Sequence, residues 1–584
     1  MTISSVLIAN RGEIAVRIAR TARDLGIRSI AVYSEADAGA FHTQVADEAY
    51  ALSGNTAGES YMNVAAVLDI AHRAGADAIH PGYGFLSENA DFARAVVDAG
   101  LIWIGPTPES IELLGDKIAA RKAAEEAGAP LAPGTSQPIS DWEEAKAFAE
   151  EHGLPIAIKA AFGGGGRGLK VVDNADDIEE AFNSAGREAK EAFGRAECYV
   201  EKFLRNPRHV EAQVIADTHG NVRVLGTRDC STQRRFQKLI EEAPAPALND
   251  AQCSHIIEGS RAICAKVGYT GAGTVEYIVS EDGTVSFLEV NTRVQVEHPV
   301  TEAVTGVDII AEQFRVAAGE RLSIDEDPRS NGHAFEFRIN SEDILNGFAP
   351  CPGTITKFEP PTGPGIRVDS AVRSGSVIPP YYDSLIAKLI VWGPTREIAL
   401  RRARRALQEF TITGVRTVLP FHRDMVERTE LATEDIGVYT DWVDHNYSPS
   451  AAVESVDIES IYDERTAVAV EIDGKLVNIG FPVSLLGSGS AGASVSGSAS
   501  TAEEGNDDAA SGAVRAKFAA NLVSWKVDDG AEVSEGDVIA AVEAMKMESN
   551  IKAPCTGTIT FKANPGERVE ANAVIATISQ TCAK

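Results

Sequence analysis

One segment of the sequence concentrates groups that bind phosphates, metal ions and small anions. In LEVNTRVQVEH, residues 288–298, charged and amide side chains alternate with apolar ones. An extended strand would place the polar set on one face and turn Leu288 and the other apolar residues toward a core. We therefore expect a strand whose front is a functional site, with a merely solvated sheet face as the alternative. The polar set comprises Glu289, Asn291, Arg293, Gln295 and Glu297.

A second carboxylate is expected opposite Glu289. TVEYIV and TVSFLEV flank Asp282-Gly283, a strong signal for a two-residue hairpin turn. A turn centred there pairs Glu276 with Glu289, with Cβ atoms roughly 5 Å apart, and like charges at that spacing repel. With Asn291, the two carboxylates offer the hard oxygen ligands that magnesium prefers. The sequence therefore predicts a magnesium site, on the assumption that the loop has two residues.

A glycine-rich stretch, PIAIKAAFGGGGRGLKVVD, is a further candidate for anion binding. A strand follows its loop where a dinucleotide-binding fold requires a helix, and the GK[ST] of a P-loop is missing. The pattern instead indicates a hairpin whose backbone N–H groups cover phosphates. Lys159 before the loop and Arg167 within it favour anion binding over a simple flexible turn.

The C-terminal part contains an imperfect repeat. VIAAV in the first half matches VIATI in the second, and Asp529-Gly530 matches Pro565-Gly566. Between the halves lies EAMKMES, which we expect to form an exposed turn with Lys546 at its tip. Methionines on both sides of a tip lysine indicate recognition by another protein, whereas the plain alternative is a solvated lysine.

Hydrophobic patterning supplies the elements that must position these groups. Short apolar runs separated by helical periods indicate a parallel α/β sheet near the N-terminus. A Gly-, Ser- and Ala-rich stretch later in the chain cannot bury a core and is expected to be a flexible linker. The expected units are an α/β domain at 1–114, a mixed domain at 115–332 with its glycine-loop lid at about 131–204, an α+β domain at 333–446, a strand-rich connector at 447–486, the linker at 487–514 and an all-β domain at 515–584.

Composition excludes several classes of protein. A chain of 584 residues is too long for a single core. Neither a membrane span nor a signal peptide is evident, so we expect a cytoplasmic location. The net charge of −31 disfavours nucleic-acid binding. Scattered cysteines without a CxxC pair argue against disulfides and a zinc site.

The motifs together resemble two known families. Residues 1 to about 446 resemble biotin carboxylase, an ATP-grasp enzyme, through KAAFGGGGRG, RHVEAQ, RDCSTQRRFQKLIEEAP, EVNTRVQVEH, FRINSED and PPYYDSLIAKL. The C-terminal domain is similar to biotinyl domains, in which AMKM marks the attachment lysine, here Lys546. The resemblance implies a multidomain chain: an ATP-grasp body, a linker and a flattened β barrel or sandwich. It also implies the alpha subunit of an acetyl- or propionyl-CoA type carboxylase, with biotin, ATP and magnesium (or manganese) as cofactors.

The resemblance further implies roles for individual residues. Magnesium falls to Glu276, Glu289 and Asn291, and bicarbonate to Arg293, Lys238, Gln295 and the Val296 backbone. Glu297 is the candidate base, and Arg338 would bind biotin and stabilise its enolate-like oxygen; Lys238 and Arg293 complete the catalytic set. Phe236 stands where some family members have histidine, so one polar contact to the nucleotide would be missing. The nucleotide-binding residues would be Lys117, Lys159, Gly163, Gly164, Gly165, Gly166, Glu201, Lys202, Leu204, His209, Gln233, Phe236, Glu276 and Glu289.

Partners follow from the same resemblance. No segment is left to build a carboxyltransferase, so we expect a separate carboxyltransferase (beta) subunit, which alone meets the acyl-CoA. The connector at 447–486 is its candidate docking element, and a biotin protein ligase must load Lys546. An oligomer is expected. The alternatives are a component of a two-chain pyruvate or urea carboxylase, an ATP-grasp ligase unrelated to biotin, and a carrier without catalysis.

Overall fold

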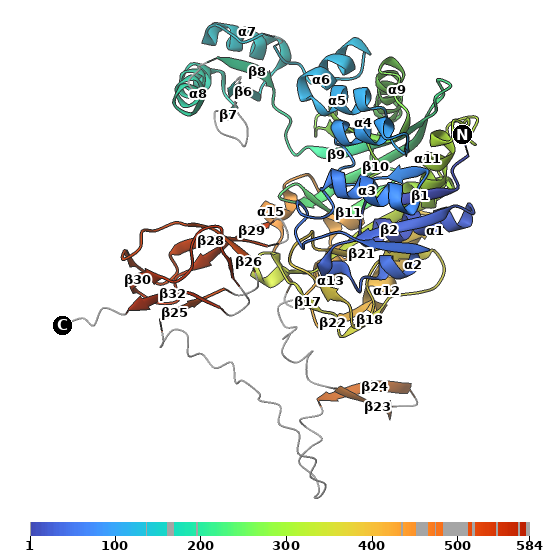
Figure 1. Cartoon of the computed structure of the whole chain (residues 1–584). Helices are drawn as coiled ribbons and strands as arrows, with labels where there is room; N and C mark the ends of the chain where they lie inside the picture. The colour runs from blue at the N-terminus through green and yellow to red at the C-terminus, as the bar shows by residue number, and fades with distance from the viewer. Residues whose placement is uncertain are drawn as a thin grey trace, which may run out of the picture.

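The computed structural model in Figure 1 has a large body, a separate two-stranded hairpin and a small all-β domain. It describes residues 2–135, 137–160, 169–193, 197–433, 436–450, 465–472, 475–482, 512–516, 520–544, 547–569 and 573–579. No helix within these ranges is both long and apolar enough to cross a membrane. The six cysteines that they include are all free, in agreement with the prediction from their spacing.

The N-terminal domain confirms the predicted parallel sheet. Its strand order is β3-β2-β1-β4-β5, and every neighbouring pair is parallel. Its first helix is α1 (Gly12–Asp24). The other elements are β1 (Ser5–Ile8), β2 (Arg28–Tyr33), β3 (Glu48–Ala51), β4 (Ala78–His80), β5 (Ile102–Trp103), α2 (Phe41–Val45), α3 (Val64–Ala74), α4 (Ala90–Asp98) and α5 (Pro108–Gly115).

An eight-stranded antiparallel sheet forms the centre of the body. Its order is β13-β12-β9-β10-β11-β14-β21-β19. Because β14 pairs with β11, this sheet runs across the boundary that the sequence suggested at residue 332. The strands are β9 (Arg208–Ala216), β10 (Val222–Arg234), β11 (Gln237–Ala243), β12 (Gly271–Val279), β13 (Val285–Asn291), β14 (His333–Asn340), β19 (Ile366–Ser370) and β21 (Leu385–Gly393).

Helices and small sheets complete the body. A three-stranded sheet of order β7-β6-β8 forms a separate lobe with α7 and α8 (Figure 1). Helices α6 (Lys117–Glu126) and α7 (Trp142–His152) follow the N-terminal domain in the chain. Further elements are α8 (Ile178–Phe193), α9 (Asp250–Lys266), α10 (His298–Thr305), α11 (Ile309–Ala317), α12 (Arg396–Glu409), α13 (Leu419–Met425), α14 (Thr429–Ala432), α15 (Trp442–Asn446), β6 (Ile156–Ala160), β7 (Leu169–Val172), β8 (Cys198–Lys202), the short strands β15 (Glu342–Asp343), β16 (Ala349–Pro350), β17 (Gly353–Thr354), β18 (Lys357–Glu359), β20 (Val377–Ile378) and β22 (Thr411–Thr413), and the connector hairpin β23 (Arg465–Ile472) and β24 (Lys475–Pro482).

The C-terminal domain consists of two four-stranded sheets, β25-β32-β30-β27 and β29-β28-β26-β31. They reproduce the sequence repeat, and the matched turns place Gly530 and Gly566 at nearly equal φ angles of 84° and 85°. β25 begins inside the predicted linker because it pairs with β32. The strands are β25 (Ala513–Arg515), β26 (Ala520–Trp525), β27 (Glu532–Val533), β28 (Val538–Ala544), β29 (Met547–Lys552), β30 (Gly557–Phe561), β31 (Arg568–Val569) and β32 (Val574–Ser579).

Candidate active site

The predicted pair of opposed carboxylates is present. Glu276 on β12 lies directly opposite Glu289 on β13, although the hairpin loop is not the one expected. The pairs nearer the turn are shifted by one residue, so the loop has three residues, 281–283. A bulge at Leu288 then restores the register, which leaves that side chain 46% exposed instead of buried. Two departures from the predicted hairpin therefore cancel at Glu276 and Glu289.

The electrostatics of the pair agree with the repulsion argument. Burial, and then the charge of Glu276, raise the pKa of Glu289, while Lys117 at 3.9 Å opposes them. Burial also acts to raise the pKa of Glu276, but Lys238 and His209 outweigh it and hold that pKa well below its usual range. A divalent cation beside Glu289 would relieve the same repulsion, and the two carboxylates are the oxygen donors that magnesium favours. These residues fit the ion.

Strand β13 ends at Asn291, so the prediction of a strand through Glu297 was wrong. Residues 292–297 instead form a loop leading into α10, and Glu297 is the residue just before that helix. Arg293 in this loop donates to Gln295 Oε1 at 3.1 Å and to Glu88 Oε2 at 2.8 Å. Glu88, in the N-terminal domain, was missed by sequence analysis. Its ion pair with Arg293 brings the predicted bicarbonate arginine to the interface with that domain.

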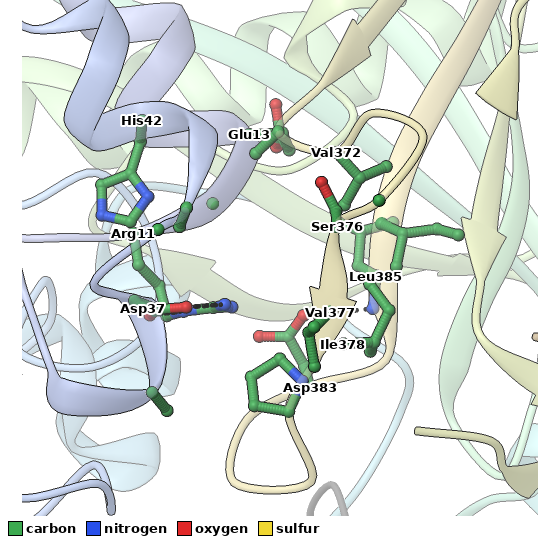
Figure 2. Close-up of a pocket in the computed structure, with 18 residues that line it drawn as sticks. Arg11, Glu13, Asp37, His42, Val372, Ser376, Val377, Ile378, Asp383 and Leu385 are labelled. Carbon is green, nitrogen blue, oxygen red and sulfur yellow. Dashed lines mark hydrogen bonds and ion pairs between the residues drawn. The ribbon is translucent and has the colours of Figure 1, made fainter. Parts of the chain in front are cut away.

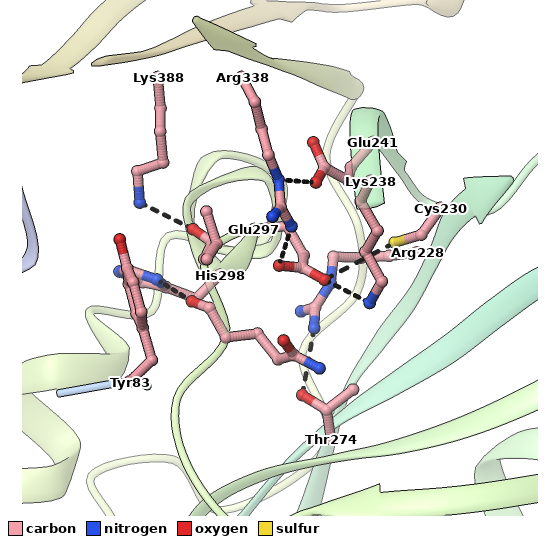
Figure 3. Close-up of polar contacts among 12 residues, drawn as sticks. Tyr83, Arg228, Cys230, Lys238, Glu241, Thr274, Glu297, His298, Arg338 and Lys388 are labelled. Atoms are coloured by element: carbon pink, nitrogen blue, oxygen red, sulfur yellow. Dashed lines mark hydrogen bonds and ion pairs between the residues drawn. The ribbon is translucent and has the colours of Figure 1, made fainter. Parts of the chain in front are cut away.

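Glu297 lies between the two predicted catalytic cations (Figure 3). Its Oε1 accepts from Lys238 Nζ at 2.6 Å, and its Oε2 accepts from Arg338 Nη2 at 2.9 Å. Burial raises the pKa of Glu297, but Lys238 and Arg338 outweigh it and bring the pKa to about 2. Lys238 therefore contributes first to keeping Glu297 ionised, ahead of Arg338.

A buried row of charges supports this centre. Across the sheet, Arg228, Glu211, Glu276 and Glu289 lie side by side on four strands. Arg228 is fully buried and donates to Glu211 Oε1 at 2.6 Å. Lys238 joins the row through Glu211 at 2.7 Å and Glu276 at 3.1 Å. Sequence analysis missed Arg228 and Glu211, although the period-two spacing of Glu211 with His209 in RHVEAQ was an available signal.

A second opposed pair lies behind Arg338. Glu241 on β11 faces Glu336 on β14, and both side chains are fully buried. Arg338 Nε donates to Glu241 Oε1 at 2.5 Å, whereas neither oxygen of Glu336 has a hydrogen-bond partner among the described residues. Burial, only partly offset by Arg338, raises the pKa of Glu241 to about 7. Burial also raises the pKa of Glu336 well above its usual range.

The predicted nucleotide residues fall into separate groups. In the β6-β7-β8 lobe, Lys159 forms an ion pair with Glu201, and Lys202 Nζ donates to backbone oxygens of residues 152 and 154 at 3.2 Å. In the central sheet, Gln233 Nε2 donates to a backbone oxygen at 3.1 Å, and His209 lies 3.2 Å from Glu276. Burial acts to lower the pKa of His209, but the neighbouring carboxylates Glu276 and Glu211 outweigh burial and raise this pKa to about 9.

The other predicted nucleotide residues and the attachment lysine have different outcomes. Phe236, at the tip of the β10–β11 hairpin, is 88% exposed with φ of 63°, so the aromatic ring is open to solvent at that turn. Leu204 is half-buried after β8. Lys546 and the four glycines Gly163, Gly164, Gly165 and Gly166 lie outside the described residues.

Two cavities lie where the N-terminal domain meets the end of the central sheet. The larger, of about 230 Å³, lies between Arg11, Asp37 and His42 on one side and Ser376 and Asp383 on the other (Figure 2). The smaller, of about 60 Å³, shares Arg11 and Asp383 but adds Tyr83, which hydrogen-bonds to Glu13. Glu13 in turn contacts Lys388, whose Nζ donates to the Val296 backbone oxygen at 2.7 Å. The smaller cavity is therefore linked to the loop that carries Glu297.

Comparison with known proteins decides the family. Residues 2–111 match the family described as "Biotin carboxylase, N-terminal domain", residues 116–325 "Carbamoyl-phosphate synthase L chain, ATP binding domain", residues 336–445 "Biotin carboxylase C-terminal domain", and residues 512–578 "Biotin-requiring enzyme". The biotin-dependent acyl-coenzyme A carboxylase alpha3 subunit of Mycobacterium leprae is 52% identical over 98% of this chain and 97% of its own length. The chain belongs to the biotin carboxylase family, fused to a biotin carrier domain.

Relatives of the biotin carboxylase body alone are also similar. The biotin carboxylase of Haemophilus influenzae is 50% identical over 73% of this chain and 95% of its own. The solved biotin carboxylase domain dimer of Hydrogenobacter thermophilus 2-oxoglutarate carboxylase, in complex with MgADP and bicarbonate, has a TM-score of 0.66. It is 45% identical and covers 76% of this chain and 98% of its own. The body is therefore an ATP-dependent biotin carboxylase, as its motifs predicted.

Proposed function

We propose that this biotin carboxylase uses ATP and bicarbonate to carboxylate biotin carried on Lys546, and supplies a separate carboxyltransferase subunit that acts on an acyl-CoA. The observation that carries the assignment of residues is the position of Glu297 between Lys238 and Arg338. One carboxylate that touches both an anion-binding lysine and an oxyanion-stabilising arginine suits a base placed between two half-reactions.

In the first half-reaction Glu297 would take the proton of bicarbonate. Arg293 and Lys238 supply the positive charge that binds the anion, with Gln295 and the Val296 backbone beside them. As Lys238 turns its charge toward bicarbonate, the pKa of Glu297 would rise from about 2 toward that of an effective base. The oxygen left by that proton attacks the γ-phosphorus of ATP, and ADP leaves.

Nucleotide and metal would occupy the neighbouring strands. Lys117, Lys159 and the glycine loop would hold the phosphates, and Glu276, Glu289 and Asn291 would hold magnesium, which supplies positive charge beside them. Manganese offers the same coordination chemistry and is the alternative ion. The adenine side would meet Glu201, Lys202 and Leu204, and the ribose would meet His209 and Gln233.

In the second half-reaction carboxyphosphate breaks down to carbon dioxide and phosphate, and phosphate removes the ureido proton of biotin. Arg338 would stabilise the negative charge that develops on the ureido oxygen. Although burial lowers the pKa of Arg338, Glu241 and Glu297 outweigh it and raise that pKa, so the side chain remains cationic.

We propose an acyl-CoA as the acceptor because the relative that matches both the body and the carrier is a subunit of an acyl-coenzyme A carboxylase. The Mycobacterium leprae relative matches the body and the carrier, with 98% coverage. A pyruvate carboxylase subunit of Methanothermobacter thermautotrophicus is 48% identical but matches only 76% of this chain. A two-chain pyruvate or urea carboxylase is the alternative. Without β25 the linker predicted from composition has 26 residues, 487–512, nearly all of them outside the described residues; a flexible chain of that length would span roughly 30 Å and would keep biotin at an effective concentration of around millimolar.

Several partners belong to the same proposal. A biotin protein ligase loads Lys546, and the connector hairpin β23–β24 is the candidate docking element for the carboxyltransferase. The Hydrogenobacter thermophilus body is a dimer, and we expect this chain to form an oligomer as well. Its location is proposed to be cytoplasmic.

The test is to purify the full chain with its bound carboxyltransferase and supply labelled bicarbonate and ATP. Acetyl-CoA or propionyl-CoA should become labelled, whereas label in pyruvate or urea would overturn the proposed acceptor. A Lys546→Arg chain should lose its streptavidin-reactive band and its acceptor labelling but keep carboxylation of free biotin. A biotinylated Lys546→Arg chain would show that the attachment residue is misassigned.

A further inference from the structure

The structure holds the carrier domain against the body at a contact between Arg568 and Tyr381. The guanidinium carbon of Arg568 on β31 lies 4.3 Å from the centre of the Tyr381 ring. That distance is within the roughly 6 Å over which a cation is attracted to an aromatic face. β29 of the carrier also lies beside β16 of the body, so the two domains meet at a second place. Figure 1 shows β26 and β29 on the side of the carrier that faces the body.

Tyr381 belongs to a firmly held segment of the body. The next residue, Tyr382, is buried; its hydroxyl donates to the Asn55 backbone oxygen at 2.5 Å and is hydrogen-bonded to the Ser34 hydroxyl at 2.6 Å. Arg11 covers the Tyr382 ring at 4.3 Å. These contacts tie the segment to the N-terminal domain and present the half-buried Tyr381 at a fixed position.

The same segment leads into the smaller cavity. Asp383, two residues after Tyr381, lines that cavity together with Tyr83 and Arg11. Tyr83 is linked through Glu13 and Lys388 to the loop that carries Glu297. A domain seated on Tyr381 is therefore beside an opening that is connected to the catalytic loop.

On the carrier, Arg568 lies at the end of the sheet that bears the attachment hairpin. In the order β29-β28-β26-β31, Arg568 is aligned with Asn521, Asn521 with Glu543, and Glu543 with Glu548. Adjacent strands are about 4.8 Å apart, so Arg568 is two strand spacings, roughly 10 Å, from Glu543. Glu543 directly precedes Ala544, whose pairing with Met547 encloses residues 545 and 546. Contact through Arg568 thus brings this end of the carrier to the body.

We propose that the packing of the Arg568 guanidinium on the Tyr381 ring is a docking contact. Through it, this chain's own carrier domain presents its biotin to the body. The inference rests on the proposed attachment at Lys546. It assigns a specificity role to two residues outside the catalytic machinery. In this proposal the contact sets the orientation of the carrier when it reaches the body.

The test compares tethered and free biotin in the same full-length, biotinylated chain. Arg568→Ala and Tyr381→Ala should each slow single-turnover carboxylation of the tethered biotin by about five- to thirtyfold. Carboxylation of free biotin should not change, because free biotin needs no docking. Tyr381→Phe, which keeps the ring, should retain the tethered rate. Lys562→Ala is the matched control, since it removes another exposed cation of the carrier.

The possible outcomes separate the docking proposal from the function on which it rests. Wild-type rates for tethered biotin in both Arg568→Ala and Tyr381→Ala would overturn the docking contact. An equal loss of free-biotin activity in Tyr381→Ala would show that the ring supports the cavity and not docking. If streptavidin finds no biotin on Lys546 of the full chain, the proposed attachment is refuted before docking is measured.

Discussion

Replacing Arg338 with methionine should separate the catalytic role of this residue from its effect on stability. The guanidinium joins Glu241 at 2.5 Å to Glu297 at 2.9 Å, and methionine keeps most of the side-chain volume while removing the charge. Glu297 retains Lys238 at 2.6 Å and should stay ionised. Glu241 has no second cation at hydrogen-bond distance among the described residues, so its proton equilibrium should change most.

The size of the effect follows from the pKa of Glu241. Burial raises this pKa to about 7 even though Arg338 lowers it. The pKa must therefore rise further when Arg338 is removed. Below pH 7 the carboxyl is protonated in both proteins, and the mutational change in unfolding free energy should not depend on pH. Above pH 7 the wild-type carboxyl ionises while the variant must hold its proton, which the unfolded chain releases. The penalty should then grow by about 1.4 kcal/mol per pH unit, or about 3 kcal/mol between pH 7 and 9.

Urea unfolding followed by tryptophan fluorescence from pH 6 to 9 measures this directly. In an Arg338→Met chain that also carries Glu241→Gln, the growth of the unfolding penalty above pH 7 should vanish because the titrating group is gone. A penalty in Arg338→Met that is constant up to pH 9 would refute the assignment of the proton to Glu241. In parallel, biotin carboxylation should fall by about 100- to 1000-fold while the ATP dissociation constant stays unchanged. A large rise in that constant would refute the role of Arg338 at biotin.

Three further predictions follow from the site. Glu289→Gln should raise the magnesium concentration for half-maximal activity at least tenfold, because one of two anionic ligands is lost; an unchanged magnesium titration would exclude Glu289 as a ligand. Phe236→His should lower the KM for ATP by about fivefold with kcat unchanged, since one hydrogen bond contributes about 1 kcal/mol; equal KM values would contradict a nucleotide contact there. Arg228→Met should cost about 3–5 kcal/mol in urea unfolding, and adding Glu211→Gln should recover part of it, because the cost comes from a buried carboxylate that loses one of its cationic partners and keeps only Lys238 and His209 nearby. No recovery in the double variant would refute that cause.

The sequence was most informative where chemistry is set by neighbours along the chain. Period-two spacing placed Glu289 and Asn291 on a strand, and hairpin symmetry found the partner of Glu289. The same reasoning extended the strand too far, because the alternation of polar and apolar residues continues after Asn291 into a loop. There Val294 is buried by tertiary packing and not by the face of a sheet. Alternation alone could not distinguish these two cases.

Residues that depend on strand order were out of reach. Glu241 and Glu336 are 95 positions apart and meet only because β14 pairs with β11, and no local pattern specifies that pairing. Glu88 reaches Arg293 from another domain for a similar reason. The predicted domain boundary at residue 332 also hid this part of the site, since the sheet continues across it.

The central sheet contains two directly opposed carboxylate pairs, and their burial decides how each repulsion is relieved. Glu276 and Glu289 lie at the edge hairpin, where the Glu289 side chain is 38% exposed, so a hydrated cation can reach the pair. Glu241 and Glu336 are fully enclosed, and burial raises the pKa of both carboxyls, so a proton is the available counter-charge. The first pair can therefore respond to magnesium, and the second to pH. Because Arg338 bonds to both Glu241 and Glu297, the protonation of the enclosed pair is coupled to the proposed base, and through it the pH response of the sheet would reach catalysis.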